Sequence, residues 1–211
     1  MGREGRPLIL TKDLKSAKII KDRSTKNKKG GHCMSIEIIV AVADDRVIGH
    51  EKKMPWGRLS RDLSRFKNIT DGQKIVMGYT TLVSIGKELP GRKVLVLTRD
   101  PSKLAPFPWC VVVTKKAVLK MAKTERIIIA GGEMVYREFL PYTTVVYITR
   151  IKECFKGDTF FPKLSLSKWE LESSTFWEKD EDKTPYPIEF ETWVRRTEKP
   201  TTKRRRYGKS D

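Results

Sequence analysis

Apolar residues follow two spacings along this chain, and segments with the two spacings alternate. Short apolar runs rich in β-branched residues are typical of buried strands, whereas apolar positions three and four residues apart are typical of helices. From residue 169 onward, two segments alternate apolar and polar positions as the strands of a hairpin do. We therefore expect strands at residues 36–43, 74–77, 94–97, 109–113, 126–130, 144–151, 169–177 and 187–195, and helices at about 59–70, 80–87, 117–123 and 135–140.

This order of elements predicts the class of fold. Strands that alternate with helices form parallel sheets, because each crossover returns the chain to the same end of the sheet. The final hairpin adds antiparallel strands at one edge. We expect an α/β domain with a mostly parallel, twisted eight-stranded sheet, an antiparallel C-terminal hairpin and flanking helices.

An acidic residue, Asp62, falls on the apolar face of the helix expected from residue 59. The apolar stripe consists of Leu59, Leu63, Phe66 and Ile69. A carboxylate in that position is desolvated unless a cation or a hydrogen-bond donor meets it. It is therefore either a structural cap or a group that handles protons. Ser60 already offers a capping hydroxyl nearby, which weakens the capping interpretation without removing it.

Two strand-to-helix junctions carry residues that suit phosphate binding. Gly131–Gly132 follows the strand at 126–130 and opens a helix, and Thr80–Thr81 occupies the same position after the strand at 74–77. Glycine lets the backbone approach a ligand closely, and the first amides of a helix attract anions. A tight packing turn explains the glycine pair about as well. Together, however, the two junctions suit a ligand with several phosphates, such as a dinucleotide.

Two arginines stand where they could bind anions. Arg99 follows the strand that ends near Thr98 and could reach a further phosphate. Arg92 follows the turn at residues 89–91 and could pair bidentately with a carboxylate. A solvated surface arginine is the alternative for each.

Positive charge is concentrated at the ends of the chain. The 211 residues carry a formal net charge of +18, yet only +7 remains for residues 34–196, because residues 1–33 hold 10 Lys or Arg against 3 acids and residues 197–211 hold 6 against 2. We expect a flexible basic leader at 1–33, one domain at 34–196 and a disordered basic tail at 197–211. Nonspecific contact of the tails with nucleic acid is one expectation, and solvated tails that aid solubility are the other.

Cysteine and histidine are scarce. Three scattered cysteines do not make a disulfide framework, and two histidines give no metal-ligand spacing, so we expect a reduced protein without a metal. No apolar run reaches the roughly 18 residues of a membrane span. We expect a soluble, cytoplasmic protein, most simply a monomer.

Taken in order, several segments resemble the dihydrofolate reductase family. Their joint order over residues 36 to about 195 is far more specific than any one of them. They are residues 43–49 (ADDRVIG), 54–56 (MPW), 62–67 (DLSRFK), 76–78 (VMG), 84–86 (SIG), 89–92 (LPGR), 131–132 (GG) with 135–136 (VY), and 157–162 (GDTFFP).

The resemblance implies an activity. Members of that family reduce 7,8-dihydrofolate to 5,6,7,8-tetrahydrofolate with NADPH: hydride passes to the pteridine, and a proton reaches ring nitrogen 5. The product supports thymidylate synthesis and one-carbon metabolism, and the family is a target of antifolates. Carried over, the Asp62 carboxyl group would bind the pteridine's amino group and nitrogen 3 and assist the protonation. Burial should raise its pKa, which suits an acid or relay near neutral pH.

The resemblance also implies roles for further residues. Residues 49–56 would be a mobile lid, and the Gly131–Gly132 peptide bond would be cis. The catalytic residues would be Asp62, Trp56, Thr149 and Tyr136. The substrate would be bound by Ile39, Val40, Asp62, Leu63, Phe66, Ile85, Arg92 and Thr149. NADPH would be bound by Ala41, Ile48, Gly49, Gly78, Thr80, Thr81, Thr98, Arg99, Ala130, Gly131, Gly132, Glu133, Met134, Val135 and Tyr136.

Three residues depart from the family pattern. Tyr79 stands where many members carry Lys or Arg near the adenosine phosphate, so the preference for NADPH over NADH depends more on Arg99. Ala130 replaces a bulkier aliphatic residue. Glu133 follows the glycine pair where Gly or Ser is frequent, and we expect its side chain to point to solvent.

Two other functions compete with this one. A related reductase that acts on a ribosylated pyrimidine in riboflavin synthesis shares the fold, but an acid at position 62 favours a pteridine. A nucleic-acid-binding protein would use the basic ends, notably residues 203–206. It would need neither a buried acid nor a strand-Gly-Gly-helix junction.

Overall fold

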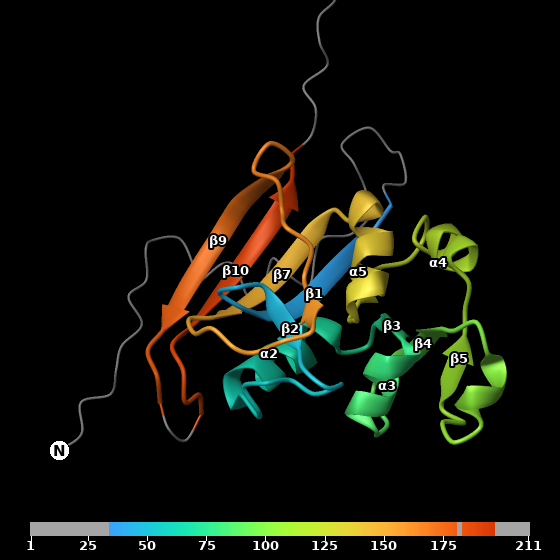
Figure 1. The fold of residues 1–211 in the computed structure, drawn as a ribbon. Helices are drawn as coiled ribbons and strands as arrows, with labels where there is room; N and C mark the ends of the chain where they lie inside the picture. The colour runs from blue at the N-terminus through green and yellow to red at the C-terminus, as the bar shows by residue number, and fades with distance from the viewer. Residues whose placement is uncertain (1–33, 181–182, 197–211) are drawn as a thin grey trace, which may run out of the picture.

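The computed structural model of the protein describes residues 34–180 and 183–196. The leader and the tail expected at 1–33 and 197–211 lie outside these residues. A mixed eight-stranded sheet runs through the molecule in the order β5-β4-β3-β6-β1-β7-β10-β9 (Figure 1). Its strands are β1 (Ile36–Ala43), β3 (Lys74–Gly78), β4 (Lys93–Leu97), β5 (Cys110–Val112), β6 (Ile127–Ile129), β7 (Val145–Ile151), β9 (Trp169–Trp177) and β10 (Ile188–Arg195).

The direction of the strands confirms the predicted fold class. From β5 to β7, every neighbouring pair is parallel, whereas β10 runs antiparallel to both β7 and β9. A second, small sheet pairs β2 (Val47–Gly49) with β8 (Thr159–Phe160). The C-terminal hairpin therefore forms an antiparallel edge, as its alternating pattern predicted.

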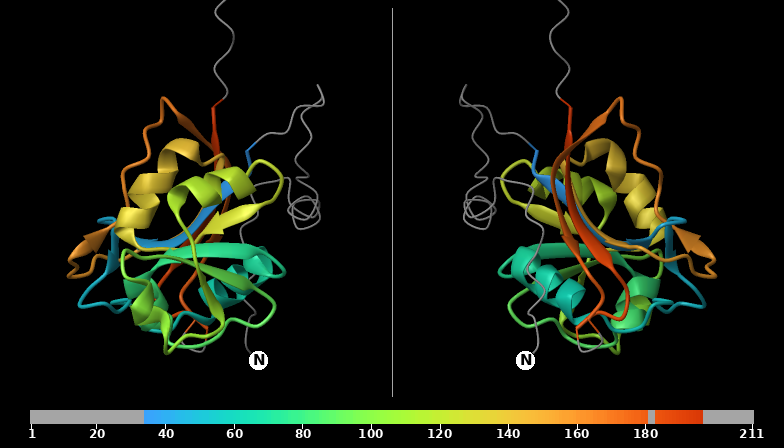
Figure 2. Two further views of the ribbon diagram at one scale, coloured as in Figure 1. Left: turned by 90° about the vertical axis from the view of Figure 1, so that its right-hand side faces the viewer. Right: turned by 90° about the vertical axis from the view of Figure 1, so that its left-hand side faces the viewer.

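Helices cover both faces of the sheet. Within the described residues, the α-helices are α2 (Ser60–Thr70), α3 (Tyr79–Ile85), α4 (Lys115–Met121) and α5 (Glu133–Phe139), and the short 3₁₀ helices are η1 (Pro101–Leu104) and η2 (Leu140–Tyr142). Figure 2 shows α2 and α3 on one face and α4 and α5 on the other. The chain moves outward from β1 through β3 to β5 and then returns through β6 to β7. Right-handed crossovers in opposite directions place their helices on opposite faces.

No side chain caps the start of α2 or α3. The N-cap of α2 is Leu59, so Ser60 is already a helical residue and its hydroxyl comes one position too late to cap. Strand β3 extends to Gly78, which is itself the N-cap of α3, so Thr80 and Thr81 lie inside the helix. Helix α4 begins earlier than expected, because the Thr114 hydroxyl accepts a hydrogen bond from the Ala117 amide at 3.2 Å.

The core divides according to the alternation of side chains along the strands. Ile36, Ile38, Val40 and Val42 of β1 pack in one cluster with residues of α4 and α5. Ile39 faces the other way and packs in a second cluster with residues of α2 and α3. Both faces of β1 are therefore largely apolar, which explains its mostly hydrophobic sequence; the exception is the buried Glu37, which pairs with Arg126.

The sheet opens at the carboxyl end of β1. Pairing between β1 and β6 ends at Ile38 opposite Ile129, while β1 stays paired with β7 as far as Ala43. The helices that follow β1 and β6 leave on opposite faces, and such a switch point is where open α/β sheets bind ligands. In the described part of the chain, no helix is long and apolar enough to cross a membrane.

Candidate active site

Asp62 lies in the first turn of α2, close to the carboxyl end of the central strands. Leu59 and Ile69, 2% and 5% exposed, anchor the two ends of the helix in the core. The Asp62 carboxyl group forms a side-chain hydrogen bond with Thr149 of β7. Thr149 is buried, and its strand neighbours are Ala41 of β1 and Phe190 of β10. The structure therefore brings together these two residues, both of which the sequence named as catalytic candidates.

The surroundings of Asp62 change its affinity for a proton. Burial raises the pKa of its carboxyl group, and the Thr149 hydrogen bond and the nearby positive charge of Arg65 only partly oppose this shift. The apolar stripe itself is less complete than the sequence predicted, because Leu63 is 39% exposed. Asp62 does not serve as the helix cap, since Leu59 holds that position. The capping interpretation of this acid is therefore wrong, and its role in handling protons stays a prediction.

Tyr136 approaches the same region from the opposite face of the sheet. Its buried hydroxyl donates a hydrogen bond to the carbonyl of Ile39 at 2.9 Å, just where β6 no longer pairs with β1. Burial and the charge of Asp62 both raise the pKa of the Tyr136 hydroxyl, so it stays protonated. The ring packs edge to face against Phe161, with centroids 5.2 Å apart. Tyr136 is thus fixed beside the opening in the sheet.

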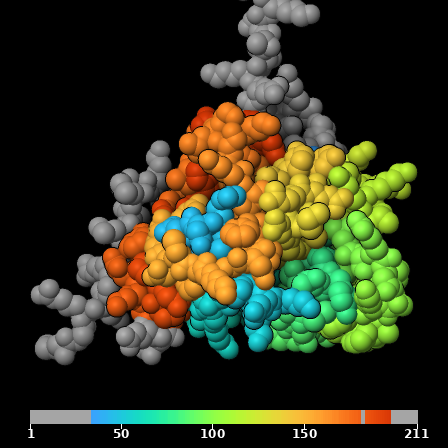
Figure 3. Space-filling view, viewed as in Figure 1, coloured from blue at the N-terminus to red at the C-terminus, as the bar shows by residue number. Residues whose placement is uncertain are grey.

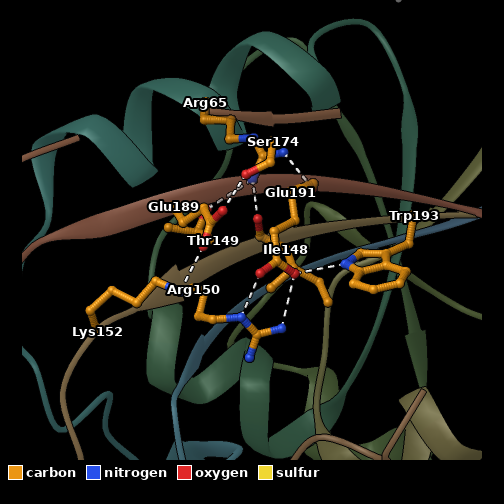
Figure 4. Close-up of polar contacts among 9 residues, drawn as sticks. All are labelled: Arg65, Ile148, Thr149, Arg150, Lys152, Ser174, Glu189, Glu191 and Trp193. Atoms are coloured by element: carbon orange, nitrogen blue, oxygen red, sulfur yellow. Dashed lines mark hydrogen bonds and ion pairs between the residues drawn. The ribbon is translucent and has the colours of Figure 1, made fainter. Parts of the chain in front are cut away.

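Arg65 is a site residue to which the sequence assigned no role. It lies one helical turn after Asp62, and Figure 4 shows its side chain reaching from α2 to β7 and β10. The guanidinium donates to the carbonyls of Ile148 at 2.5 Å and Glu191 at 2.8 Å, and to Thr149 Oγ1 at 3.2 Å. Its position three residues after Asp62 was the available signal, because residues i and i+3 share a helix face.

Trp56 and the lid expected at residues 49–56 lie beside this site. Trp56 is 4% exposed and packs edge to face against Phe155, with centroids 5.8 Å apart. The lid makes a tight turn in which the amides of His50 and Lys53 each donate to the other's carbonyl at 2.9 Å. Figure 3 shows this cyan segment on the surface, between α3 and the C-terminal segments. Whether the lid moves stays a prediction.

The expected substrate-binding side chains gather on the α2 face, with one exception. Phe66 and Ile85 are half-buried and pack against the same cluster as Ile39, whereas Leu63 of α2 is exposed and does not join that cluster. Val40 does not join them, because its side chain packs in the cluster under α4 and α5.

Arg92 lies at the far end of α2. Its Nη1 donates a long hydrogen bond, 3.4 Å, to the hydroxyl of Thr70, the last residue of the helix. Its Nε is buried and has no hydrogen-bond partner among the described residues. The guanidinium therefore retains donors that a carboxylate could accept.

The two strand-to-helix junctions meet in space. The amide of Gly78 donates to the carbonyl of Gly131 at 2.9 Å, and Gly78 and Gly132 are the N-caps of α3 and α5. Neither helix has a side-chain cap, so two sets of free amides lie close together. A Cβ on Gly131 would lie 2.9 Å from Thr81 Cγ2, so only glycine fits there. The Gly131–Gly132 bond is cis, as predicted.

The remaining cofactor candidates are distributed around these junctions. Thr80 lines a hollow of about 510 Å³ together with Glu51 and Lys52 of the expected lid and with Asp158 and Thr159 at the start of β8. Thr98 is engaged in a local turn, where its hydroxyl accepts from the Asp100 amide at 3.1 Å. The other candidates fall into three groups by exposure: Arg99 and Met134 are exposed, Ala41, Ile48, Gly49 and Ala130 are half-buried, and Val135 is buried. Tyr79 is half-buried against the α2 and α3 cluster.

The prediction that Glu133 points to solvent is wrong. Its carboxylate accepts hydrogen bonds from the Phe160 amide at 2.8 Å and from Arg137 Nε at 2.8 Å. Burial opposes ionisation, but these two donors outweigh it and lower the pKa of Glu133. Glu133 therefore ties α5 to β8, and this structural role accounts for an acid beside the glycine pair.

Comparisons with known proteins agree with this geometry. The family model for dihydrofolate reductase matches residues 35–195. The dihydrofolate reductase of Staphylococcus haemolyticus is 40% identical over 164 residues, which make up 77% of this chain and 96% of that protein. The enzyme of Bacillus subtilis (strain 168) is 41% identical over 157 residues, 74% of this chain and 91% of that protein. A solved dihydrofolate reductase from Enterococcus faecalis, complexed with NADP(H) and RAB-propyl, has a TM-score of 0.71 and 35% identity, and the match covers 77% of this chain and 97% of that one.

The fold and site define a doubly wound α/β protein with a partly buried acid at its switch point. The chain belongs to the dihydrofolate reductase family, because the family model spans nearly all of the described residues. The predicted resemblance and the oxidoreductase class are thereby confirmed, and NADPH is the cofactor of the family.

Proposed function

We propose that this protein reduces 7,8-dihydrofolate to 5,6,7,8-tetrahydrofolate with NADPH, and that Asp62 assists protonation of the pteridine. The observation that carries the proposal is the hydrogen-bonded pair of Asp62 and Thr149, set where the sheet opens. A carboxylate accepts hydrogen bonds, so the ionised Asp62 would bind an amino group and a ring N–H side by side. A pteridine carries such an amino group and ring N–H next to each other on one edge of its ring.

The raised pKa of Asp62 supports the proton-transfer role. An acid acts best when its pKa lies near the working pH, and burial moves the pKa of this carboxyl group in that direction. Thr149 holds the carboxyl group in one orientation, and Tyr136 closes the opposite side of the opening. We propose that the proton reaches ring nitrogen 5 from this group by way of water, with Trp56 above the site.

The glycine junctions support the choice of cofactor. NADPH, when bound, supplies the hydride. The free amides at the starts of α3 and α5 would hold its pyrophosphate and second phosphate, because helix N-termini attract anions. Thr80, Thr81 and Arg99 would add donors at the same edge. The close approach of Gly131 to Thr81 keeps the two junctions near enough to share one ligand.

Arg92 would bind the glutamate carboxylate of the substrate. Its buried Nε has no hydrogen-bond partner in the described part of the chain, and a guanidinium matches a carboxylate in a bidentate geometry. The half-buried Phe66 and Ile85 would line the path between Asp62 and Arg92 and contact the benzoyl ring. A role in thymidylate and one-carbon metabolism, and a cytoplasmic location, belong to the same proposal.

One assay tests the activity directly. Protein, NADPH and dihydrofolate are mixed, and absorbance is followed at the nicotinamide band, with methotrexate as the inhibitor control. We expect oxidation of NADPH that requires dihydrofolate and stops on addition of methotrexate. NADPH oxidation that proceeds equally without dihydrofolate would contradict the proposed function.

A further inference from the structure

The guanidinium of Arg65 contacts the hydrogen-bond partner of Asp62, which makes Arg65 part of the acid's immediate surroundings. Its Nη1 donates to Thr149 Oγ1 at 3.2 Å. A guanidinium has donors and no acceptor, so the Thr149 oxygen must accept this bond and its proton must point elsewhere. The Asp62 carboxyl group is the side-chain partner of that hydroxyl. Arg65 thereby selects the orientation in which Thr149 donates to Asp62.

Arg65 itself is held firmly in this position. Two further hydrogen bonds, to the carbonyls of Ile148 at 2.5 Å and Glu191 at 2.8 Å, tie its guanidinium to the main chains of β7 and β10. Its Cζ atom also lies 4.5 Å from the centroid of the Phe190 ring. Contacts from two strands and a ring leave the guanidinium little freedom to turn toward solvent.

No carboxylate neutralises Arg65 through an ion pair among residues 34–180 and 183–196. The nearest strand acid, Glu191, offers Arg65 its backbone carbonyl, while its carboxylate binds Arg150 Nε at 2.5 Å and Nη2 at 2.9 Å (Figure 4). Trp193 Nε1 donates to the same carboxylate at 2.7 Å. Arg150 therefore offsets the charge of Glu191, and the Arg65 charge remains available to act on Asp62.

We propose that Arg65 is a positioning residue that orients the Thr149 hydroxyl toward Asp62 and favours the ionised form of this acid, so that it lowers the pH at which Asp62 takes up a proton. The effect of Arg65 on catalysis rests on the proposed function. The ionised form is the one that accepts hydrogen bonds from the pteridine edge, and the protonated form is the one that supplies a proton. Arg65 therefore adjusts the balance between binding and proton transfer.

The other groups around Asp62 do not replace this effect. On α2, Arg61 pairs with Asp180 at 3.2 Å and lies over the Trp177 ring. From α5, Tyr136 presents a protonated hydroxyl that is bonded to Ile39. From β7 and β10, Tyr147 and Glu191 act on Arg65 and favour its charged form. Burial lowers the pKa of Arg65 to about 10, which still leaves it charged at neutral pH.

Carboxyl carbon NMR of the full-length chain, labelled at aspartate, tests the proposal without turnover. Asp62→Asn identifies the Asp62 signal. We expect Arg65→Gln to move the titration midpoint of that signal upward by roughly one pH unit, the usual size for one nearby charge. Arg61→Gln, which removes an equal charge from the same helix, is the matched control and should move it by no more than a few tenths. An unmoved midpoint in Arg65→Gln, or an equal rise in both variants, would overturn the proposal.

Two further measurements guard against a variant that fails to fold. Arg65→Lys keeps the positive charge, so we expect its Asp62 titration midpoint to lie close to that of the unsubstituted protein. In the unsubstituted protein, the guanidinium nitrogen signals of Arg65 should titrate together with the Asp62 carboxyl signal, while those of Arg61 should not. Arg65 signals that do not change at the Asp62 midpoint would contradict the proposal, as would an unmoved midpoint in Arg65→Gln.

Turnover then separates this inference from the activity it depends on. In Arg65→Gln, the alkaline limb of the dihydrofolate turnover profile should move to higher pH in parallel with the NMR midpoint, because more Asp62 stays protonated. A protein that shows the NMR coupling but never oxidises NADPH with dihydrofolate would refute the proposed function alone. If the NMR midpoint of Asp62 moves while the alkaline limb of the turnover profile does not, the proposed effect of Arg65 on catalysis is refuted.

Discussion

At the scale of residues, the carboxyl group of Asp62 dominates the site, because it lies where burial disfavours its ionised form. Burial raises its pKa, and only one hydroxyl and one guanidinium oppose that shift. We expect Asp62→Asn to lower turnover at neutral pH by roughly 10²- to 10⁴-fold, the usual contribution of a positioned acid or base. Binding of NADPH, measured by fluorescence titration, should be unchanged. Turnover like that of the unsubstituted protein would remove Asp62 from the mechanism.

The same substitution should stabilise the fold. The folded state binds the Asp62 proton more tightly than the unfolded chain, whose carboxyl pKa is near 3.8. The free energy of unfolding therefore falls as pH rises from that value through the raised pKa, and it stays low above it. Asp62→Asn avoids this loss and can still accept the Thr149 hydrogen bond. We expect its urea midpoint to exceed that of the unsubstituted protein at pH 7, by a margin that shrinks toward pH 4. A margin that grows on acidification would contradict the assigned burial.

Arg92 permits a separate test of substrate recognition. Arg92→Leu removes the donors that we assign to the glutamate carboxylate, and a hydrogen bond to a charged group contributes about 1.5–3 kcal/mol. The KM for dihydrofolate should rise roughly 10- to 100-fold with little change in kcat, because the lost contact is equal in ground and transition states. The neighbouring exposed Lys93→Leu serves as the control. An unaltered KM in Arg92→Leu would refute the role.

At the scale of elements, the two phosphate junctions depend on close packing between α3 and the turn before α5. Gly131 has a φ of +135°, and an added Cβ would meet Thr81 Cγ2 at 2.9 Å. Gly72 also has a positive φ, +69°, in the left-handed helical region, but no atom lies within 4 Å of its added Cβ. Alanine at Gly72 therefore tests the backbone conformation alone.

We expect Gly131→Ala to lower the free energy of unfolding by roughly 2–5 kcal/mol, the sum of strained backbone and overpacking. Gly72→Ala should lower it by roughly 1–2 kcal/mol. Urea unfolding measures both, and a titration with NADPH should show weaker binding for Gly131→Ala only. Equal losses in the two variants would mean that contact with Thr81 is unimportant.

The elements show what the sequence could and could not predict. The strands and the position of Asp62 followed from periodicity, because burial on a face imposes a fixed spacing. The starts of α2 and α3 did not follow from the sequence, because a capping residue is recognised only when the first helical residue is known. Here the N-caps are Leu59 and Gly78, and neither forms a side-chain hydrogen bond to its helix. Arg65 was missed because its partners lie 83 to 126 residues away in sequence. Such contacts depend on strand register, which one sequence does not reveal.

At the scale of the whole molecule, the candidate active site and most of the excess positive charge lie in different parts of the chain. The site lies entirely within residues 35–195, the span of the family model. Of the net charge of +18, residues 34–196 carry only +7, and the remainder belongs to residues 1–33 and 197–211. Removal of both ends should therefore leave turnover intact and change only interactions that depend on charge.

We expect the full-length chain to retard DNA or RNA in a gel at low salt and to release it as salt rises, because each phosphate contact releases counterions. Residues 34–196 alone should lose this binding while turning over dihydrofolate at the full rate. Replacement of Lys203, Arg204, Arg205 and Arg206 by glutamine in the full-length chain should weaken retardation and reduce its salt dependence. The folded domain also carries lysines around α4, at positions 115, 116, 120 and 123. Undiminished retardation by residues 34–196 would assign the binding to that domain instead of the ends.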